Sequence, residues 1–139
     1  MSNERLGKYI SILYRQSQIY FNAELKKYQL GSGQYIFLLG LLKNDGINQE
    51  QLADYVKIDK ATTARAVAKL EREGYLIREI CPTDKRAYIL HPTDKAKKIS
   101  ENLDKILDHW NDTLLAGFSA KEKDILQKFL ARIRNNIFS

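Results

Sequence analysis

Apolar positions in the first third of the chain follow two different patterns. From about Asn3 to Tyr28 they recur every three or four residues, which predicts one long amphipathic helix. Gly31 and Gly33 interrupt this pattern, and Ser32 between them is the expected N-cap of the next helix. Residues 34–43 are apolar nearly all round, so we expect this second helix to be buried at the centre of the fold.

The stretch from Ile47 to Leu90 begins with two short helices. Asn48 followed by Gln51 has the spacing of a capping box, which predicts a helix start there. After a tight turn, Asp59 is the expected N-cap of a further helix, which should end at Gly74. The inward-facing positions of this further helix are Thr63, Val67 and Leu70. Two short helices joined in this way are typical of a helix-turn-helix motif.

A predicted β-hairpin follows directly after Gly74. Residues 75–80 and 87–90 are rich in apolar and β-branched side chains, whereas residues 81–86 have the composition of a turn. A hairpin attached to a helix-turn-helix is a wing, and Ile47 is expected to add a short strand beside it. The predicted fold class is therefore mainly α with a small β-wing, built on a winged helix-turn-helix core.

The C-terminal part of the chain predicts two more helices. Pro92-Thr93-Asp94 signals a helix that should run to about Phe118, and Ser119 with Glu122 forms a capping box for the last helix. The N- and C-terminal helices carry long apolar stripes, so we expect them to be dimerisation helices that pack against each other and against a second copy. The expected interface residues are Leu6, Tyr9, Leu13, Leu126, Phe129, Leu130, Ile133 and Ile137.

Composition narrows the class of protein. The 139 residues are enough for one domain with a real core, and 44% hydrophobic with 29% charged residues is ordinary for a globular protein. The formal net charge of +6 favours an anionic partner, although a ribosomal or membrane-surface protein would give a similar balance. One cysteine excludes an internal disulfide framework. Without an apolar leader or a long apolar span, we expect a cytoplasmic protein with no membrane partner.

Candidate DNA-binding residues lie on the helix after Asp59 and at the wing tip. The outward face of that helix is small near its N-terminus and basic further along, which suits entry into a DNA groove. At the wing tip a basic pair could reach the minor groove, and Asp84 could hold Arg86 in position. The full set is Lys57, Lys60, Ala61, Thr62, Arg65, Lys69, Asp84, Lys85 and Arg86, with the lysines expected at phosphates. The alternatives are a solvated basic helix face and a surface ion pair on the hairpin.

Signals for other chemistry are weak. Cys81 lies at the base of the wing, but no basic cluster obviously lowers the pKa of its thiol, so we expect a plain surface or half-buried cysteine. His91 and His109 are far apart and have no ligand cluster at metal spacing, so we expect no metal and no cofactor. No nucleophile elbow, phosphate loop or paired-acid motif appears, and we expect no catalysis.

The segment from Ile47 to Ala96 resembles the winged-helix core of the MarR (multiple antibiotic resistance regulator) family. The matching marks are Leu52-Ala53, Ile58-Asp59-Lys60, Leu70-Glu71 before Gly74, Arg78, Asp84-Lys85-Arg86 and Thr93. The segment departs from the family at Pro92, where Leu is usual, and at Ala96, where Gly is common. The resemblance implies a single MarR-type domain over residues 1–139, with a DNA-binding core at about 30–91 and dimerisation helices at about 1–29 and 92–139.

The resemblance also implies an effector, a small lipophilic or phenolic ligand that weakens DNA binding. Side chains between the dimerisation helices and the DNA-binding core could line its cavity, and the candidates are Ile10, Tyr14, Tyr35, Phe37 and Trp110. Aromatic residues at helical spacing are more often ordinary core, and that alternative stays open.

Three classes of function remain to be compared. The leading hypothesis is a ligand-responsive homodimeric repressor that reads a pseudo-palindromic operator in double-stranded DNA. The alternative is a winged-helix module for protein–protein contacts, whose basic face is incidental. An enzyme is the third class and has no motif in its favour. Steep salt dependence of duplex binding separates the first two, because phosphate contacts release counterions.

Overall fold

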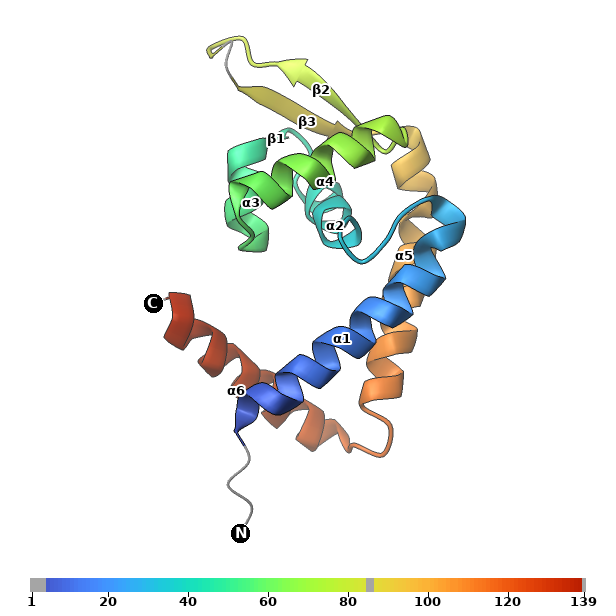
Figure 1. Ribbon diagram of the computed structural model, residues 1–139, viewed down its shortest axis with the longest axis vertical. Helices are drawn as coiled ribbons and strands as arrows, with labels where there is room; N and C mark the ends of the chain where they lie inside the picture. Colours follow the sequence, from blue (N-terminus) through green and yellow to red (C-terminus); the bar gives the residue numbers. More distant parts are fainter. Residues whose placement is uncertain (1–4, 85–86, 139) are drawn as a thin grey trace. The chain divides into compact units, whose positions relative to one another are not determined.

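The computed structural model describes residues 5–84 and 87–138 of the chain (Figure 1). These residues belong to two compact units, Met1–Ile106 and Leu107–Ser139. Across the described ranges, no helix combines the length and the apolar character that crossing a bilayer requires.

The first unit begins with α1 (Leu6–Leu25), which continues into a 3-10 turn, η1 (Lys26–Tyr28). Gln29 ends this turn with a left-handed φ of 56°. The predicted first helix is thus confirmed within the described residues, although its last turn is 3-10 rather than α. The side chains of α1 that the unit buries, Phe21 and Leu25, lie towards its C-terminal end.

The second helix, α2 (Tyr35–Lys43), is buried at the centre of the first unit as its apolar sequence predicts. The prediction of Ser32 as its N-cap is wrong, because the helix starts after Gln34. The Ser32 N–H instead donates to Asn22 Oδ1 at 2.7 Å, and the Gly31 N–H donates to Gln34 Oε1 at 2.9 Å. Side-chain acceptors on both sides hold the loop, so the serine hydroxyl is not needed as a cap.

Five short elements follow and form the helix-turn-helix and the wing. They are β1 (Ile47–Asn48), α3 (Gln49–Val56), α4 (Lys60–Arg72), β2 (Leu76–Ile80) and β3 (Tyr88–Pro92). The strands form an antiparallel sheet in the order β1-β3-β2, and Leu90 of β3 pairs with Ile47 on one side and Arg78 on the other. The winged helix-turn-helix prediction is confirmed, including the added strand at Ile47.

The core of the first unit lies where α2, α3, α4 and the sheet meet. The side chains of Leu52, Val67, Leu70, Tyr75 and Leu90 are almost completely buried there. Gly40 of α2 allows a close approach to α3, because a Cβ atom at this position would lie 3.2 Å from Leu52 Cδ1 and 3.3 Å from Tyr55 Cδ1. The missing side chain therefore sets the spacing of the two helices.

The next helix, α5 (Asp94–Leu114), is fixed to the end of α4 at its N-terminus. The Thr93 hydroxyl donates to the Gly74 carbonyl oxygen at 2.6 Å and accepts from the Ala96 N–H at 3.3 Å. The Lys95 ammonium donates to the Glu73 carbonyl oxygen, also at 2.6 Å. These bonds satisfy carbonyl groups that the end of a helix would otherwise leave without partners.

The second unit contains the end of α5 and α6 (Ala120–Phe138). The prediction that the long helix runs to about Phe118 is wrong, because α5 ends at Leu114 and Gly117 adopts a φ of 83°. The predicted capping box of α6 is confirmed: the Glu122 N–H donates to Ser119 Oγ, and the Ser119 N–H donates to Glu122 Oε1. Among the described residues of α6, none is buried.

Candidate nucleic-acid interface

Helix α4 is defined at both ends by side-chain and backbone capping. The Asp59 carboxylate accepts from the Thr62 N–H at 2.9 Å, as expected of an N-cap. At the other end Gly74 has a φ of 80°, and the Tyr75 N–H donates to the Leu70 carbonyl oxygen at 2.8 Å. This pattern is a Schellman motif, in which glycine tolerates the left-handed backbone. Both predicted boundaries of the helix are confirmed.

The two faces of α4 differ sharply in burial. The inward face is buried through Thr63, Ala66, Val67 and Leu70. On the opposite face Lys60, Ala61 and Arg65 are exposed, while Thr62 and Lys69 are half-exposed. The face that the sequence assigns to DNA therefore points away from the core of its own unit.

A chain of hydrogen bonds connects three residues on the exposed face of α4. The Thr62 hydroxyl lies 2.7 Å from Asp59 Oδ1, and an Arg65 Nη atom lies 3.1 Å from the same hydroxyl oxygen. Hydrogen bonds from the Thr62 N–H and hydroxyl lower the pKa of the Asp59 carboxyl below its ordinary value. The carboxylate is thus ionised at neutral pH, and the guanidinium is held beside it through the threonine.

The turn between α3 and α4 places two more of the predicted lysines. Lys57 ends α3 with a left-handed φ of 59°, and its side chain is exposed. Lys60 forms an ion pair with Glu50 of α3 at 3.3 Å, and both side chains are largely exposed. Such exposed pairs contribute little, so the Lys60 ammonium can exchange this carboxylate for a phosphate at small cost.

The wing is attached to α4 by contacts that the sequence did not single out. Arg78 of β2 donates to Glu71 of α4 at 3.2 Å, and its guanidinium carbon lies 5.8 Å from the centre of the Tyr88 ring on β3. Glu71 and Arg78 are seven residues apart. The turn at Gly74 brings the two side chains together, and neither helical nor strand periodicity predicts this contact.

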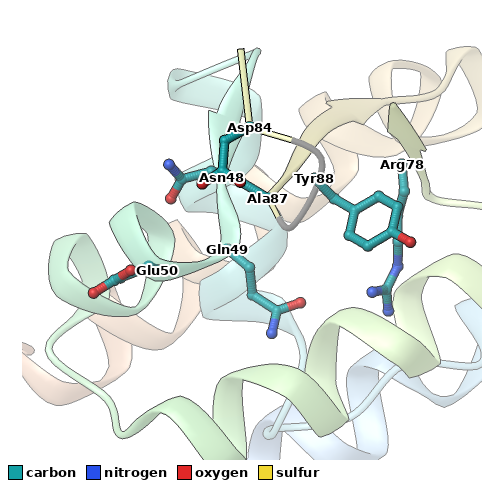
Figure 2. A pocket seen from close by; sticks show the side chains of 7 residues that line it. All are labelled: Asn48, Gln49, Glu50, Arg78, Asp84, Ala87 and Tyr88. Atoms are coloured by element: carbon teal, nitrogen blue, oxygen red, sulfur yellow. The ribbon is translucent and has the colours of Figure 1, made fainter. Parts of the chain in front are cut away.

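A surface pocket of about 470 Å³ lies between the start of α3 and the wing (Figure 2). It is lined by Asn48, Gln49, Glu50, Arg78, Asp84, Ala87 and Tyr88. Figure 2 shows Gln49 and Arg78 extending from two sides of this pocket, one from α3 and the other from β2. Asp84 is exposed. Lys85 and Arg86 lie outside the described residues, and with them the expected contact between Asp84 and Arg86.

The wing also carries a histidine bonded at both ring nitrogens. His91 of β3 contacts Asp45 through Nδ1 at 2.5 Å and Glu79 of β2 through Nε2 at 2.8 Å. The hydrogen bonds with Asp45 and with Glu79 raise the pKa of the imidazole above its ordinary value. His91 is a candidate metal ligand by residue type alone, and spacing along the chain does not reveal this bridge, because its partners lie 46 and 12 residues away.

Cys81 differs from the sequence-based expectation in one respect. Hydrogen bonds from the Thr83 side chain and from the backbone of Thr83 and Asp84 lower the pKa of its thiol. The sequence showed no basic cluster with this effect, and the source here is the turn itself. The side chain is half-buried, as expected. Within residues 5–84 and 87–138, no group of three potential metal ligands is close enough together to hold an ion.

The predicted dimerisation residues are largely accessible within their own units. In α1, Leu6, Tyr9 and Leu13 are each about half exposed. In α6, Phe129, Leu130 and Ile137 are exposed, while Leu126 and Ile133 are half-buried. Apolar side chains in this number are costly to leave in water, so these faces are candidates for contact with another molecule.

The predicted effector residues have different environments. Phe37 is buried in the core, with 1% of its surface exposed. Tyr35 is half-buried and stacks on Phe21 with ring centres 4.3 Å apart. Ile10 and Tyr14 are exposed. Trp110 belongs to the second unit, where it is half-buried. The effector site stays a prediction.

Comparison with known proteins identifies the family. The MarR family model matches residues 28–87. The uncharacterized HTH-type transcriptional regulator YybA of Bacillus subtilis (strain 168) is 36% identical over 92% of this chain and 85% of its own length. The chain belongs to the MarR family. A MarR transcriptional regulator from Methanosarcina mazei Go1 is 42% identical, with a TM-score of 0.87 over 95% of this chain and 96% of that structure.

A further MarR-family structure was solved with DNA. This putative MarR family transcriptional regulator from Listeria monocytogenes, complexed with 26mer DNA, is 30% identical with a TM-score of 0.90. The match covers 96% of this chain and 89% of that structure. The relatives are named as transcriptional regulators, so the MarR resemblance is confirmed and the enzyme class is set aside.

Proposed function

We propose that the chain is a transcriptional regulator that binds a specific sequence in double-stranded DNA, with α4 in the major groove. The observation that carries this proposal is the outward face of α4, where Lys60, Ala61 and Arg65 are exposed beside Thr62. This face combines small side chains with hydrogen-bond donors, which suits contact with base edges. The similarity to a regulator solved with DNA supports the same reading.

The residues of the proposed interface have separate roles. Arg65 offers several donors in a fixed geometry and reads base edges, whereas Lys57, Lys60 and Lys69 meet phosphates. Lys85 and Arg86 of the wing are proposed to reach the adjacent minor groove. Phosphate contacts fix the register of the protein on the duplex, and base contacts supply the specificity.

The active form is proposed to be a homodimer. The exposed apolar faces of α1 and α6 support this, because a second copy would bury them and would place two α4 helices on successive major grooves. A symmetric protein of this kind reads a pseudo-palindromic operator. Bound at a promoter, it acts as a repressor.

An effector would act by shifting the equilibrium between two conformations of the dimer, which differ in the spacing of their α4 helices. A lipophilic or phenolic ligand held by Ile10, Tyr14, Tyr35, Phe37 and Trp110 lowers operator affinity if it prefers a dimer with wrongly spaced α4 helices. The size of the effect equals the difference between its affinities for the two states.

The test of the DNA role is Arg65→Ala on a duplex selected from genomic fragments. The variant should lose about 1–3 kcal/mol of binding free energy, because the donors to a base edge are removed. Arg15→Ala on α1 removes the same charge and is the control, which should bind nearly as the wild type does. Mobility-shift titration measures both, and equal affinity of Arg65→Ala and wild type would contradict the assigned role.

Salt dependence separates DNA binding from an incidental basic surface. Affinity for the duplex should fall steeply as salt rises, because each neutralised phosphate releases counterions. The Lys69→Ala variant should show a slope smaller by about one, as expected for the loss of a single phosphate contact. A flat salt response would favour the protein–protein module instead.

A further inference from the structure

The Thr62 hydroxyl lies between a group that can only accept a hydrogen bond and a group that can only donate one. Asp59 Oδ1 is 2.7 Å away and belongs to an ionised carboxylate, which has no proton to give. Arg65 Nη is 3.1 Å away and belongs to a guanidinium, which has no lone pair to offer. A threonine hydroxyl normally rotates to suit its partner, but here both neighbours impose the same direction.

The proton of this hydroxyl is therefore committed to Asp59. A hydroxyl has one proton and two lone pairs, so what remains at Thr62 is acceptor capacity alone. The Asp59 carboxylate is itself fixed, because its other oxygen caps the Thr62 N–H at 2.9 Å. Thr62 is half-exposed on the outward face of α4, so a donor on the side proposed to meet DNA can approach its hydroxyl oxygen.

We propose that Asp59 makes Thr62 an acceptor-only reader of the major groove, selective for the amino groups of cytosine and adenine. In that groove cytosine N4 and adenine N6 are donors, whereas guanine and thymine present acceptors to the same approach. Asp59 is thus a positioning residue for specificity, in addition to capping the helix. This inference rests on the proposed function, since it assumes that α4 enters the groove.

The neighbouring arginine has the opposite preference. The Arg65 guanidinium has five N–H donors, and one bond to Thr62 leaves enough for a two-point contact with guanine O6 and N7. One turn of α4 therefore presents an acceptor and a donor group side by side. The pair discriminates between base pairs in a way that neither residue achieves alone.

The experiment compares base preferences, measured by selecting from randomised duplexes and by titrating the selected sites with each base at each position. Thr62→Val keeps the shape but removes the hydroxyl, and should lose roughly 2- to 12-fold of preference for an amino base at one position per half-site. Thr62→Ser keeps the hydroxyl and should retain the preference.

Asp59→Asn is the decisive variant. Asn caps a helix as well as Asp does, but its amide oxygen is needed for the Thr62 N–H, so its NH₂ group faces the hydroxyl. The hydroxyl must then accept from Asn and donate outward, and preference at the same position should shift towards guanine or thymine. Asp54→Asn on α3 makes the same charge change and should leave the base preferences of the wild type in place.

The outcomes distinguish a failure of this inference from a failure of the proposed function. If wild type selects a defined site and Asp59→Asn selects the same bases at every position, the inference is overturned while the proposed function stands. If wild type selects no duplex sequence, both are overturned. Circular dichroism and a size measurement on every variant show that changes in preference do not come from unfolding.

Discussion

The His91 side chain connects the wing to the segment between α2 and β1. It lies on β3, and its two ring nitrogens contact Asp45, between α2 and β1, and Glu79 on β2. Those hydrogen bonds favour the charged imidazole, so the bridge is strongest when the histidine is protonated. The contribution of this bridge to stability therefore depends on pH.

The stability of the protein should fall with rising pH more steeply than that of the His91→Gln variant. The folded-state pKa of His91 is raised, so its stabilisation is complete below the unfolded value of about 6.5 and is lost as pH rises through the folded value. Urea unfolding from about pH 6 to about pH 8 measures the difference.

Two further variants test the partners of the bridge. Asp45→Asn and Glu79→Gln each remove one of the carboxylates that face His91, so each should reduce the pH-dependent difference. If the unfolding free energies of wild type and His91→Gln run parallel over this range, the bridge has no role in stability.

At the scale of elements, the helix-turn-helix depends on the close approach of α2 to α3 at Gly40. A Cβ atom there would lie within 3.4 Å of three side chains: Leu52, Tyr55 and Val56. All three belong to α3, which begins at the capping box and whose C-terminal end leads into the turn before α4. A change in this spacing would move α3, against which α4 packs.

Gly40→Val should destabilise the protein by about 1–3 kcal/mol, because the added methyl groups overpack the contact between α2 and α3. Gly7→Val in α1 is the matched control, since nothing lies within 4 Å of a Cβ built at that position. Thermal or urea unfolding compares the two. Equal stability of both variants would show that the α2–α3 contact has room for a larger side chain.

Local signals in the sequence predict elements well where the interaction is itself local. Asn48 with Gln51, Ser119 with Glu122, and Gly74 all occupy the capping positions expected of them. Ser32 fails because its loop is held by Asn22 of α1, ten residues away. The predicted end of α5 near Phe118 is wrong for another reason. The apolar periodicity continues past Leu114, where the helix ends, and does not reveal that Gly117 adopts a left-handed backbone.

In the whole molecule, α1 and α6 each expose an apolar face to solvent. None of the described residues of α6 is buried, yet the helix carries an apolar stripe along its length. Contiguous exposed apolar faces mark interaction sites, and the proposed partner is a second copy of the chain.

Leu130→Asp should convert the dimer to monomer and weaken operator binding at least tenfold, because a charge in an apolar interface is costly to bury and a monomer contacts only one half-site. Gln127→Asp places the same charge at a polar position of α6 and is the control. Analytical ultracentrifugation and mobility-shift titration measure the two effects. If the Leu130→Asp variant is still a dimer, Leu130 does not lie in the interface.

The sequence predicts the order of the elements, the caps of α3, α4 and α6, and the residues on the outward face of α4. These follow from periodicity and from interactions within one turn of chain, which a linear pattern records. The contact of Arg78 with Glu71 and the bridge from His91 to two carboxylates come instead from the tertiary structure. Such contacts depend on which rotamers and which distant segments the packed core brings within hydrogen-bond distance, and no spacing along the chain encodes that.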